Sequence, residues 1–259
     1  MKIVLLSDLH MEFDAQKSWQ QLPALQQKIA DLVVLAGDIG VGYQAIELID
    51  PLLDLGYQVI YILGNHELFG QDPAQLITGW KALAQSRPGL TFLHNGSAEI
   101  HGILFFGSPL YSNLGTDSSS DAIPNWLRPA LKQIADFRKT PNWQPENMVQ
   151  AHYECRAALE LFLQSSQHSN KARVIITHFL PSIACVPNAF VGHPTNSYFA
   201  ADLDTLIKKY QPDLWLHGHT HLSITTAIGK TKILCNPKGY VDYKELNPNF
   251  NEALLTDMN

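Results

Sequence analysis

Five short polar motifs carry the side chains that can do chemistry in this chain. They are Ser7–His10 (SDLH), Gly37–Asp38 (GD), Gly64–Glu67 (GNHE), Thr177–His178 (TH) and Gly218–His221 (GHTH). Their carboxylate, amide and imidazole groups form a mixed donor set that suits Mn, Fe, Ni or Zn better than Ca. The motifs therefore predict a metal centre.

Each motif comes directly after an apolar, strand-like run, and these runs are KIVLL, DLVVLA, QVIYIL, ARVIIT and PDLWLH. Open α/β sheets bind ligands beyond the carboxyl ends of their strands, where all five motifs are expected. A single aspartate or histidine usually caps a helix or bonds within the core. Seven donors at strand ends are hard to explain in that way. The candidate ligands are Asp8, His10, Asp38, Asn65, His178, His219 and His221.

The spacing within the motifs suggests which side chains share a target. Residues two apart in a strand point the same way, so Asp8 and His10 would face one target if the chain stays extended. The same holds for His219 and His221. Asn65 and His66 are adjacent and would point apart, which predicts Asn65 towards a metal ion and His66 towards the substrate.

The elements that must position these motifs alternate between strand and helix in the first part of the chain. Such alternation predicts parallel βαβ units with right-handed crossovers. The expected strands are Ile3–Ser7, Leu32–Ala36 and Val59–Leu63, and the expected helices are Trp19–Ala30, Ala45–Leu55 and Pro73–Gln85.

After Leu90 the pattern changes to short strands in a meander, followed by a cap or insertion at 108–146 with helix around Pro129–Arg138. An amphipathic helix at Asn147–Gln164 and further α/β elements follow. The other expected elements are Thr91–Leu93, Ala98–Ile100, Ile103–Gly107, Arg173–Thr177, Ala201–Tyr210, Leu214–His217, and a hairpin of Ser223–Ala227 with Lys230–Cys235 around Gly229. A single α/β domain spanning 1–259, with two sheets and helices outside, is expected.

The composition indicates which classes of protein and which cellular compartment are compatible with this chain. The 259 residues are 46% hydrophobic with a net charge of -6, which argues against a dedicated nucleic-acid binder, although bound cations would offset acidic ligands. Cys155, Cys185 and Cys235 form no CxxC pair, so a reducing cytosol fits best.

The N-terminal strand leads directly into Asp8 and lacks the features of a signal peptide. No run is long enough to cross a bilayer, so we expect a soluble, cytoplasmic protein.

The ordered set D-x-H, GD, GNH[DE], H and GHxH resembles the calcineurin-like metallophosphoesterase superfamily, from Asp8 to His221. The segments YFAADLD, PDLWLHGHTH and CNPKGY are similar to small bacterial members. The resemblance implies a β-sandwich flanked by helices, that is, a four-layer αββα arrangement. It also implies two divalent metal ions, with Mn as the first choice and Fe, Ni or Zn as alternatives.

The same resemblance assigns roles. The implied ligands of one metal ion are Asp8, His10, Asp38 and His221, and those of the other are Asp38 as a bridge, Asn65, His178 and His219. A metal-bridging hydroxide would attack a phosphate mono- or diester. His66 matches the family's catalytic histidine and would stabilise the transition state or protonate the leaving oxygen. The expected partner is a small phosphorylated substrate, and the oligomeric state is left open.

One departure concerns His66. The protein Ser/Thr phosphatase branch has Asp three positions after its GD motif, followed by Arg and Gly. Here Gly37–Gly42 reads GDIGVG, so both the Asp and the Arg are missing. The residue that orients His66 is therefore unidentified, and a dedicated phosphoprotein phosphatase is disfavoured.

Three further residues are candidates for substrate binding. His193 lies in a loop after the TH motif, where an ordinary turn explains it equally well, and Lys238 and Tyr240 in NPKGY could reach a phosphate. Two other functions stay open. One is a catalytically silent scaffold for protein binding, which would be expected to have lost ligands. The other is a nuclease, which would call for a basic channel.

Overall fold

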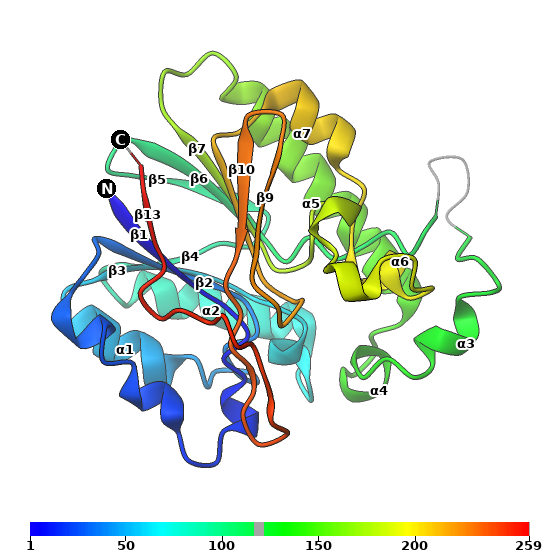
Figure 1. Ribbon diagram of the computed structural model, residues 1–259, viewed down its shortest axis with the longest axis horizontal. Coiled ribbons are helices and arrows are strands. Elements are labelled where there is room, and N and C mark those ends of the chain that lie inside the picture. Colours follow the sequence, from blue (N-terminus) through cyan, green and yellow to red (C-terminus); the bar gives the residue numbers. More distant parts are fainter. Residues whose placement is uncertain (117–121, 259) are drawn as a thin grey trace.

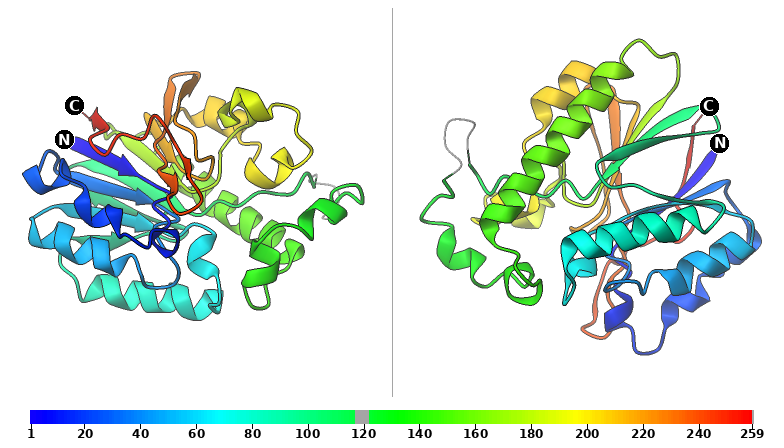
Figure 2. Two further views of the ribbon diagram at one scale, coloured as in Figure 1. Left: turned by 60° about the horizontal axis from the view of Figure 1, so that its bottom comes forward. Right: turned by 180° about the vertical axis from the view of Figure 1, so that it is seen from behind.

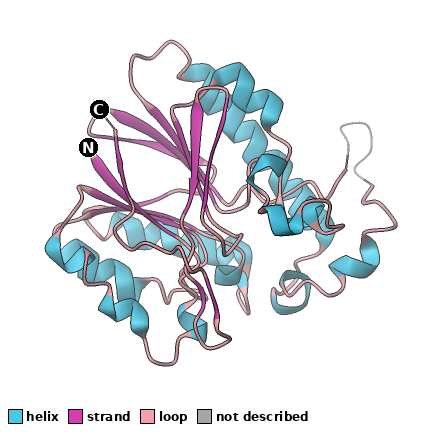
Figure 3. Ribbon diagram, in the orientation of Figure 1, coloured by secondary structure: helices cyan, strands magenta, loops and turns pink. Residues whose placement is uncertain are grey.

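Two facing β-sheets with helices on their outer faces form the framework of the molecule (Figure 1). The computed structural model describes residues 1–116 and 122–258. Figure 3 shows the order of the layers as helix, sheet, sheet and helix. The expected four-layer αββα sandwich is therefore confirmed.

The first sheet has the strand order β13-β1-β2-β3-β4. Its strands are β1 (Lys2–Leu6), β2 (Leu32–Ala36), β3 (Gln58–Ile62), β4 (Leu90–Phe92) and β13 (Leu255–Asp257). The strands β1 to β4 run parallel, whereas β13 is antiparallel to β1. Helices α1 (Ile46–Asp54) and α2 (Pro73–Gln85) cover the outer face (Figure 2). The two ends of the chain meet where the amino group of Met1 donates to the Met258 carbonyl, 2.8 Å away.

The second sheet has the order β5-β6-β7-β8-β10-β9. Its strands are β5 (Gly96–Ile100), β6 (Ile103–Ser108), β7 (Arg173–Thr177), β8 (Leu214–His217), β9 (Ile224–Ile228) and β10 (Thr231–Cys235). Helices α5 (Pro145–Ser165) and α7 (Asp204–Tyr210) lie on its outer face (Figure 2). The predicted hairpin around Gly229 is confirmed, because β9 and β10 pair antiparallel on either side of this glycine.

Short elements complete the chain between and after the sheets. They are the helices α3 (Arg128–Leu131), α4 (Asp136–Lys139) and α6 (Asn196–Phe199), the strands β11 (Gly239–Tyr240) and β12 (Glu245–Leu246), and the 3-10 helices η1 (Met11–Phe13), η2 (Ser18–Gln21), η3 (Leu25–Gln27), η4 (His66–Leu68), η5 (Ile183–Cys185) and η6 (Asn188–Phe190). Of the expected cap or insertion at 108–146, residues 117–121 lie outside the described residues. In the part of the chain that the structure describes, no helix combines the length and apolarity needed to span a membrane.

The central strands are apolar on both sides because both of their faces are covered. In β1, Ile3 and Leu5 belong to the core between the sheets, whereas Val4 and Leu6 belong to the core beneath the helices. All four side chains are at most 1% exposed. Parallel strands buried on both faces read as continuous apolar runs, which is why sequence alone located them.

Of three local expectations, two were wrong. The helix expected at Trp19–Ala30 is replaced by the short turns η2 and η3, and Pro23 between them cannot donate a helical hydrogen bond. The helix expected around Pro129–Arg138 is present, in the two short pieces α3 and α4. The expected meander does not form, because β4 pairs parallel with β3 in the first sheet while β5 and β6 form a hairpin in the second.

One buried histidine makes stability depend on pH. His152 on α5 is 3% exposed, and burial lowers its pKa to about 4 from its ordinary value of 6.5. The unfolded chain therefore takes up this proton first as the pH falls, and stability is lost between pH 6.5 and 4. At pH 4.5 we expect this residue to cost roughly 2 to 3 kcal/mol relative to pH 8.

Urea unfolding of the wild type and of His152→Gln at several pH values measures this effect. The variant should lose that part of the acid sensitivity, while His168→Gln, at an exposed position, should keep the wild-type slope. Equal slopes for all three proteins would show that His152 does not control acid stability.

Candidate metal centre

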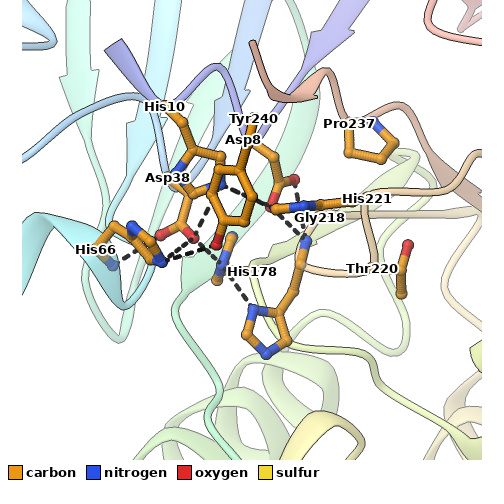
Figure 4. Close-up of polar contacts among 12 residues, drawn as sticks. Asp8, His10, Asp38, His66, His178, Gly218, Thr220, His221, Pro237 and Tyr240 are labelled. Carbon is orange, nitrogen blue, oxygen red and sulfur yellow. Dashed lines mark hydrogen bonds and ion pairs between the residues drawn. The ribbon is translucent and has the colours of Figure 1, made fainter. Parts of the chain in front are cut away.

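The five polar motifs meet at the carboxyl ends of β1, β2, β3, β7 and β8, where the two sheets adjoin (Figure 4). Seven donor residues come together there, and six of them are less than a tenth exposed. Three overlapping groups of donor atoms are close enough to hold a metal ion. The groups are Asp8–His10–His221, His10–Asp38–His66 and Asp38–His178–His219.

The convergence does not come from extended strands. Asp8, His10, Asp38, His219 and His221 all have left-handed backbones, with φ between 46° and 76°. The expectation that an extended strand aligns Asp8 with His10 was therefore wrong. Both side chains nevertheless belong to one group of donors. Such conformations are costly away from glycine and gather at functional sites.

The first group surrounds Asp8. Nε2 of His10 lies 2.9 Å from Nε2 of His221, and the latter atom lies 3.5 Å from Oδ1 of Asp8. Both Asp8 oxygens also accept the backbone N–H of His219 at 3.0 Å. Burial alone would raise the pKa of Asp8, but the hydrogen bond and charge of His221 and the charge of His178 hold it below its usual range. A carboxylate and two imidazole nitrogens thus face one point.

The Asp38–His178–His219 group surrounds His178. Its Nε2 lies 3.2 Å from Oδ2 of Asp38, 3.1 Å from Oδ1 of Asn65 and 3.2 Å from Nδ1 of His219. Nδ1 of His178 pairs with the Ala36 carbonyl at 2.9 Å, which leaves Nε2 free to serve as a ligand in the neutral ring. Burial disfavours a charge on His178, but Asp38 raises its pKa to about 10. Asp38 therefore favours positive charge here, whether a proton or a cation carries it.

Asp38 lies between the donors around Asp8 and those around His178. Its Oδ2 lies 3.2 Å from Nε2 of His178 and 3.7 Å from Nε2 of His10. Its Oδ1 accepts the backbone N–H of His66 at 2.9 Å. Gly64 allows the close approach of the two loops, because a Cβ at Gly64 would collide with the Asp38 carboxylate. This arrangement leaves Oδ2 facing both sets of imidazoles.

A buried glutamate holds the loops that carry these ligands. Glu67, the last residue of the GNHE motif, accepts the backbone N–H groups of Asp38, Ile39 and Gly64 at 2.7 to 3.0 Å. It also accepts the hydroxyl of Tyr61 at 3.0 Å. Sequence reasoning quoted Glu67 but assigned it no role. Its position ties the loop after β2 to the loop after β3.

His66 lies beside the metal-ligand candidates at the start of η4. Its Nδ1 lies 2.8 Å from Oε1 of Glu12, and its Nε2 lies 3.3 Å from the hydroxyl of Tyr240. Burial opposes a charge on this ring, but Asp38 and then Glu12 raise the pKa of His66. Sequence reasoning missed Glu12. The feature of the sequence that could have identified it is a carboxylate two residues after the D-x-H motif.

A second missed residue fixes the Asn65 amide. Oδ1 of Asp136, at the start of α4, accepts Nδ2 of Asn65 at 2.9 Å, and Oδ2 accepts the hydroxyl of Tyr198 at 2.6 Å. Because the amide nitrogen is held by Asp136, the amide oxygen of Asn65 faces His178. No sequence pattern relates these residues, which lie 71 positions apart.

Removing the Asp136 carboxylate should weaken metal binding. Partners of this kind orient a ligand, and their loss typically lowers metal affinity about 10- to 100-fold. We expect a loss of this size in Asp136→Ala, measured by competition with a chromophoric chelator. Asp202→Ala, which removes an exposed carboxylate, is the matched control. Unchanged affinity in Asp136→Ala would mean that Asn65 is oriented without it.

The three candidate substrate residues lie in different places. Tyr240 and His193 both line a cleft of about 590 Å³, which Asp38 and His66 also line. His193 also contacts the hydroxyl of Thr195 at 2.8 Å, as an ordinary turn would. Lys238 is not among the residues that line the cleft, because its ammonium donates to Ser18 at 2.7 Å.

Comparison with known proteins identifies the family. The model of the calcineurin-like phosphoesterase family matches residues 1–223, so the chain belongs to this family. An uncharacterized protein of Acanthamoeba polyphaga mimivirus is 25% identical over 98% of this chain and 95% of its own length.

Two solved structures share the fold. A phosphopantetheinyl hydrolase from Mycobacterium tuberculosis has a TM-score of 0.67 at 17% identity, over 95% of this chain and 94% of that chain. A dimetal phosphatase from Danio rerio has a TM-score of 0.57 at 14% identity, over 93% and 88% of the two chains. Family and fold support a metal-dependent phosphoester hydrolase.

The donor set fits the divalent cations that this family implies. Burial lowers the pKa of both His10 and His219, so their rings favour the neutral form that binds metals. The carboxylates of Asp8 and Asp38 supply negative charge in the same buried space. Neutral imidazoles and ionised carboxylates are the ligands that first-row cations take.

Proposed function

We propose that this protein is a dinuclear metallophosphoesterase that hydrolyses a phosphate mono- or diester. The observation that carries the proposal is the position of Asp38, whose Oδ2 faces His178 at 3.2 Å and His10 at 3.7 Å. The ligands of one ion are Asp8, His10, Asp38 and His221, and those of the other are Asp38, Asn65, His178 and His219. Manganese is the first cation to test, before Fe, Ni and Zn.

Two bound cations would supply a water of lowered pKa and a binding site for phosphate oxygens. The protein's own residues do the remaining work. Asp38 and Asp8 hold their positions through hydrogen bonds from the backbone N–H groups of His66 and His219. The Nε2 atom of His66 faces the cleft, where it can donate a proton to the leaving oxygen or stabilise developing negative charge.

The lining of the cleft favours an ester of an uncharged organic group. Away from the metal-ligand candidates, its wall includes the apolar side chains of Ile134, Val186, Phe190 and Phe199. Phe190 is 49% exposed, so an apolar surface is available there to a substrate. Among the described residues that line the cleft there is no lysine or arginine to bind further phosphate groups. This supports a simple ester over a nucleoside polyphosphate.

Hydrolysis by metal-stripped protein reloaded with Mn tests the function. The substrates are p-nitrophenyl phosphate, bis-p-nitrophenyl phosphate and ATP, with a phosphopantetheinyl ester added because the structurally similar hydrolase carries that name. We expect metal-dependent turnover of a simple ester and little release of phosphate from ATP. The preferred nitrophenyl ester separates a monoesterase from a diesterase.

Two results would contradict the proposal. Turnover that survives complete metal removal would exclude the metal centre. No turnover of any ester with Mn, Fe, Ni or Zn, despite two bound ions, would favour the silent scaffold.

A further inference from the structure

Glu12 lies between the two histidines that matter most for the chemistry proposed above. Its Oε1 is 2.8 Å from Nδ1 of His66 and 3.2 Å from Nδ1 of His10. The side chain of Glu12 is 11% exposed, and those of His66 and His10 are 8% and 0% exposed. One carboxylate oxygen therefore serves both rings in a nearly closed space.

The chemistry of the contact sets the direction of the hydrogen bond. An ionised carboxylate can only accept, so Nδ1 of His66 must carry the proton. The opposite ring atom, Nε2, then faces the cleft, with Tyr240 at 3.3 Å and Oδ2 of Asp38 at 4.0 Å. A ring rotated by 180° would place a carbon atom against Glu12 and lose this bond. Glu12 thereby selects one orientation of the ring.

Backbone contacts hold Glu12 in this place. Glu12 lies in η1, which directly follows His10. The start of η1 is held by hydrogen bonds from the N–H groups of His10 and Met11 to the carbonyls of Asp38 and Ile39, at 3.0 and 2.9 Å. The ring of Phe69 also packs against His66, with 4.3 Å between the ring centroids. His66 is thus held by two neighbours, and only Glu12 of the two bonds to its Nδ1 atom.

We propose that Glu12 is the positioning residue of His66, filling the role for which the GD motif of this chain supplies no aspartate. The inference rests on the proposed function, in which His66 acts at the leaving group. It predicts that Glu12 affects turnover through His66 and not through the metal ligand His10. The two routes are separable by experiment.

The kinetic test uses Glu12→Ala and Glu12→Gln in wild-type and His66→Ala backgrounds. We expect Glu12→Ala to lower kcat about 10- to 100-fold with little change in KM, which is part of the roughly 100- to 10,000-fold that a positioned acid contributes, and Glu12→Gln, which keeps an acceptor oxygen, to lose less. In the His66→Ala background neither change should lower turnover further. The loss should be larger for phenyl than for p-nitrophenyl esters, because the more basic phenolate needs a proton more. Glu47→Ala, an exposed glutamate on α1, is the matched control.

A spectroscopic readout tests the positioning without relying on turnover. In zinc-loaded protein labelled with ¹⁵N-histidine, two-bond ¹H–¹⁵N correlations report which ring nitrogen carries the proton, and the His66 signal is the one absent from His66→Ala. We expect a protonated Nδ1 in the wild type and in Glu12→Gln. In Glu12→Ala the proton should move to Nε2, or the signals of the two ring nitrogens should be averaged between the two tautomers. Metal content should stay at the wild-type value in all three proteins.

Two outcomes would overturn the inference. If Glu12→Ala lowers metal content, or lowers turnover equally in the His66→Ala background, Glu12 acts through His10. If the His66 signal and kcat are unchanged in Glu12→Ala, the ring is oriented by other contacts. A wild type without turnover, but with a His66 signal that depends on Glu12, would contradict the proposed function and leave the positioning role intact.

Discussion

Asp38→Ala is expected to abolish phosphoester hydrolysis, with kcat/KM falling about 1,000-fold or more, since several kcal/mol of stabilisation at the reacting phosphate would be lost. The carboxylate faces donors of both groups, with His178 at 3.2 Å and His10 at 3.7 Å. Asp38 is the carboxylate shared by two of the three donor groups, His10–Asp38–His66 and Asp38–His178–His219. Removing it should therefore reduce the metal content as well as the activity.

Steady-state kinetics and metal analysis after dialysis measure the two effects. Asp50→Ala on α1, which breaks a partly exposed ion pair with Arg87, is the control and should retain both metal and activity. Circular dichroism would show whether Asp38→Ala is folded. A folded Asp38→Ala that keeps two ions and wild-type turnover would refute the bridging role.

His66→Ala is expected to cause the second large loss of activity, and it should leave the metal centre in place. A positioned acid or electrostatic stabiliser contributes about 100- to 10,000-fold, so kcat should fall by that factor. The Nε2 atom of His66 lies 4.0 Å from Asp38 and faces the cleft, and its Nδ1 atom is bound to Glu12. Metal stoichiometry is expected to match the wild type.

Kinetics with two leaving groups make this test specific. Esters of phenol should lose more than esters of p-nitrophenol, because the better leaving group needs less protonation. His101→Ala, at the exposed turn between β5 and β6, is the control. If His66→Ala loses its metal ions instead, or hydrolyses both esters at the wild-type rate, the assignment of His66 would be wrong.

Much of the framework was predictable because its causes are local. The strands at Leu32–Ala36 and Arg173–Thr177 consist mainly of consecutive apolar residues. A run of this kind is typical of a strand buried on both faces, so it can be recognised without knowledge of the connections that follow. The helix at Pro73–Gln85 carries its own start signal in Asp72, whose side chain accepts the N–H of Gln75. The helix expected at Trp19–Ala30 failed because apolar spacing was given more weight than Pro23.

The identity of the donors in the candidate centre could be predicted from residue types and their order, because an apolar strand followed by Asp, Asn or His can be recognised in the sequence. Tertiary structure alone decided how the donors converge. The left-handed backbone of Asp8 accompanies hydrogen bonds from the N–H of His219, which lies 211 positions away. Glu12 and Asp136 reach His66 and Asn65 across 54 and 71 positions. Such contacts depend on how the elements pack, and local spacing carries no record of that packing.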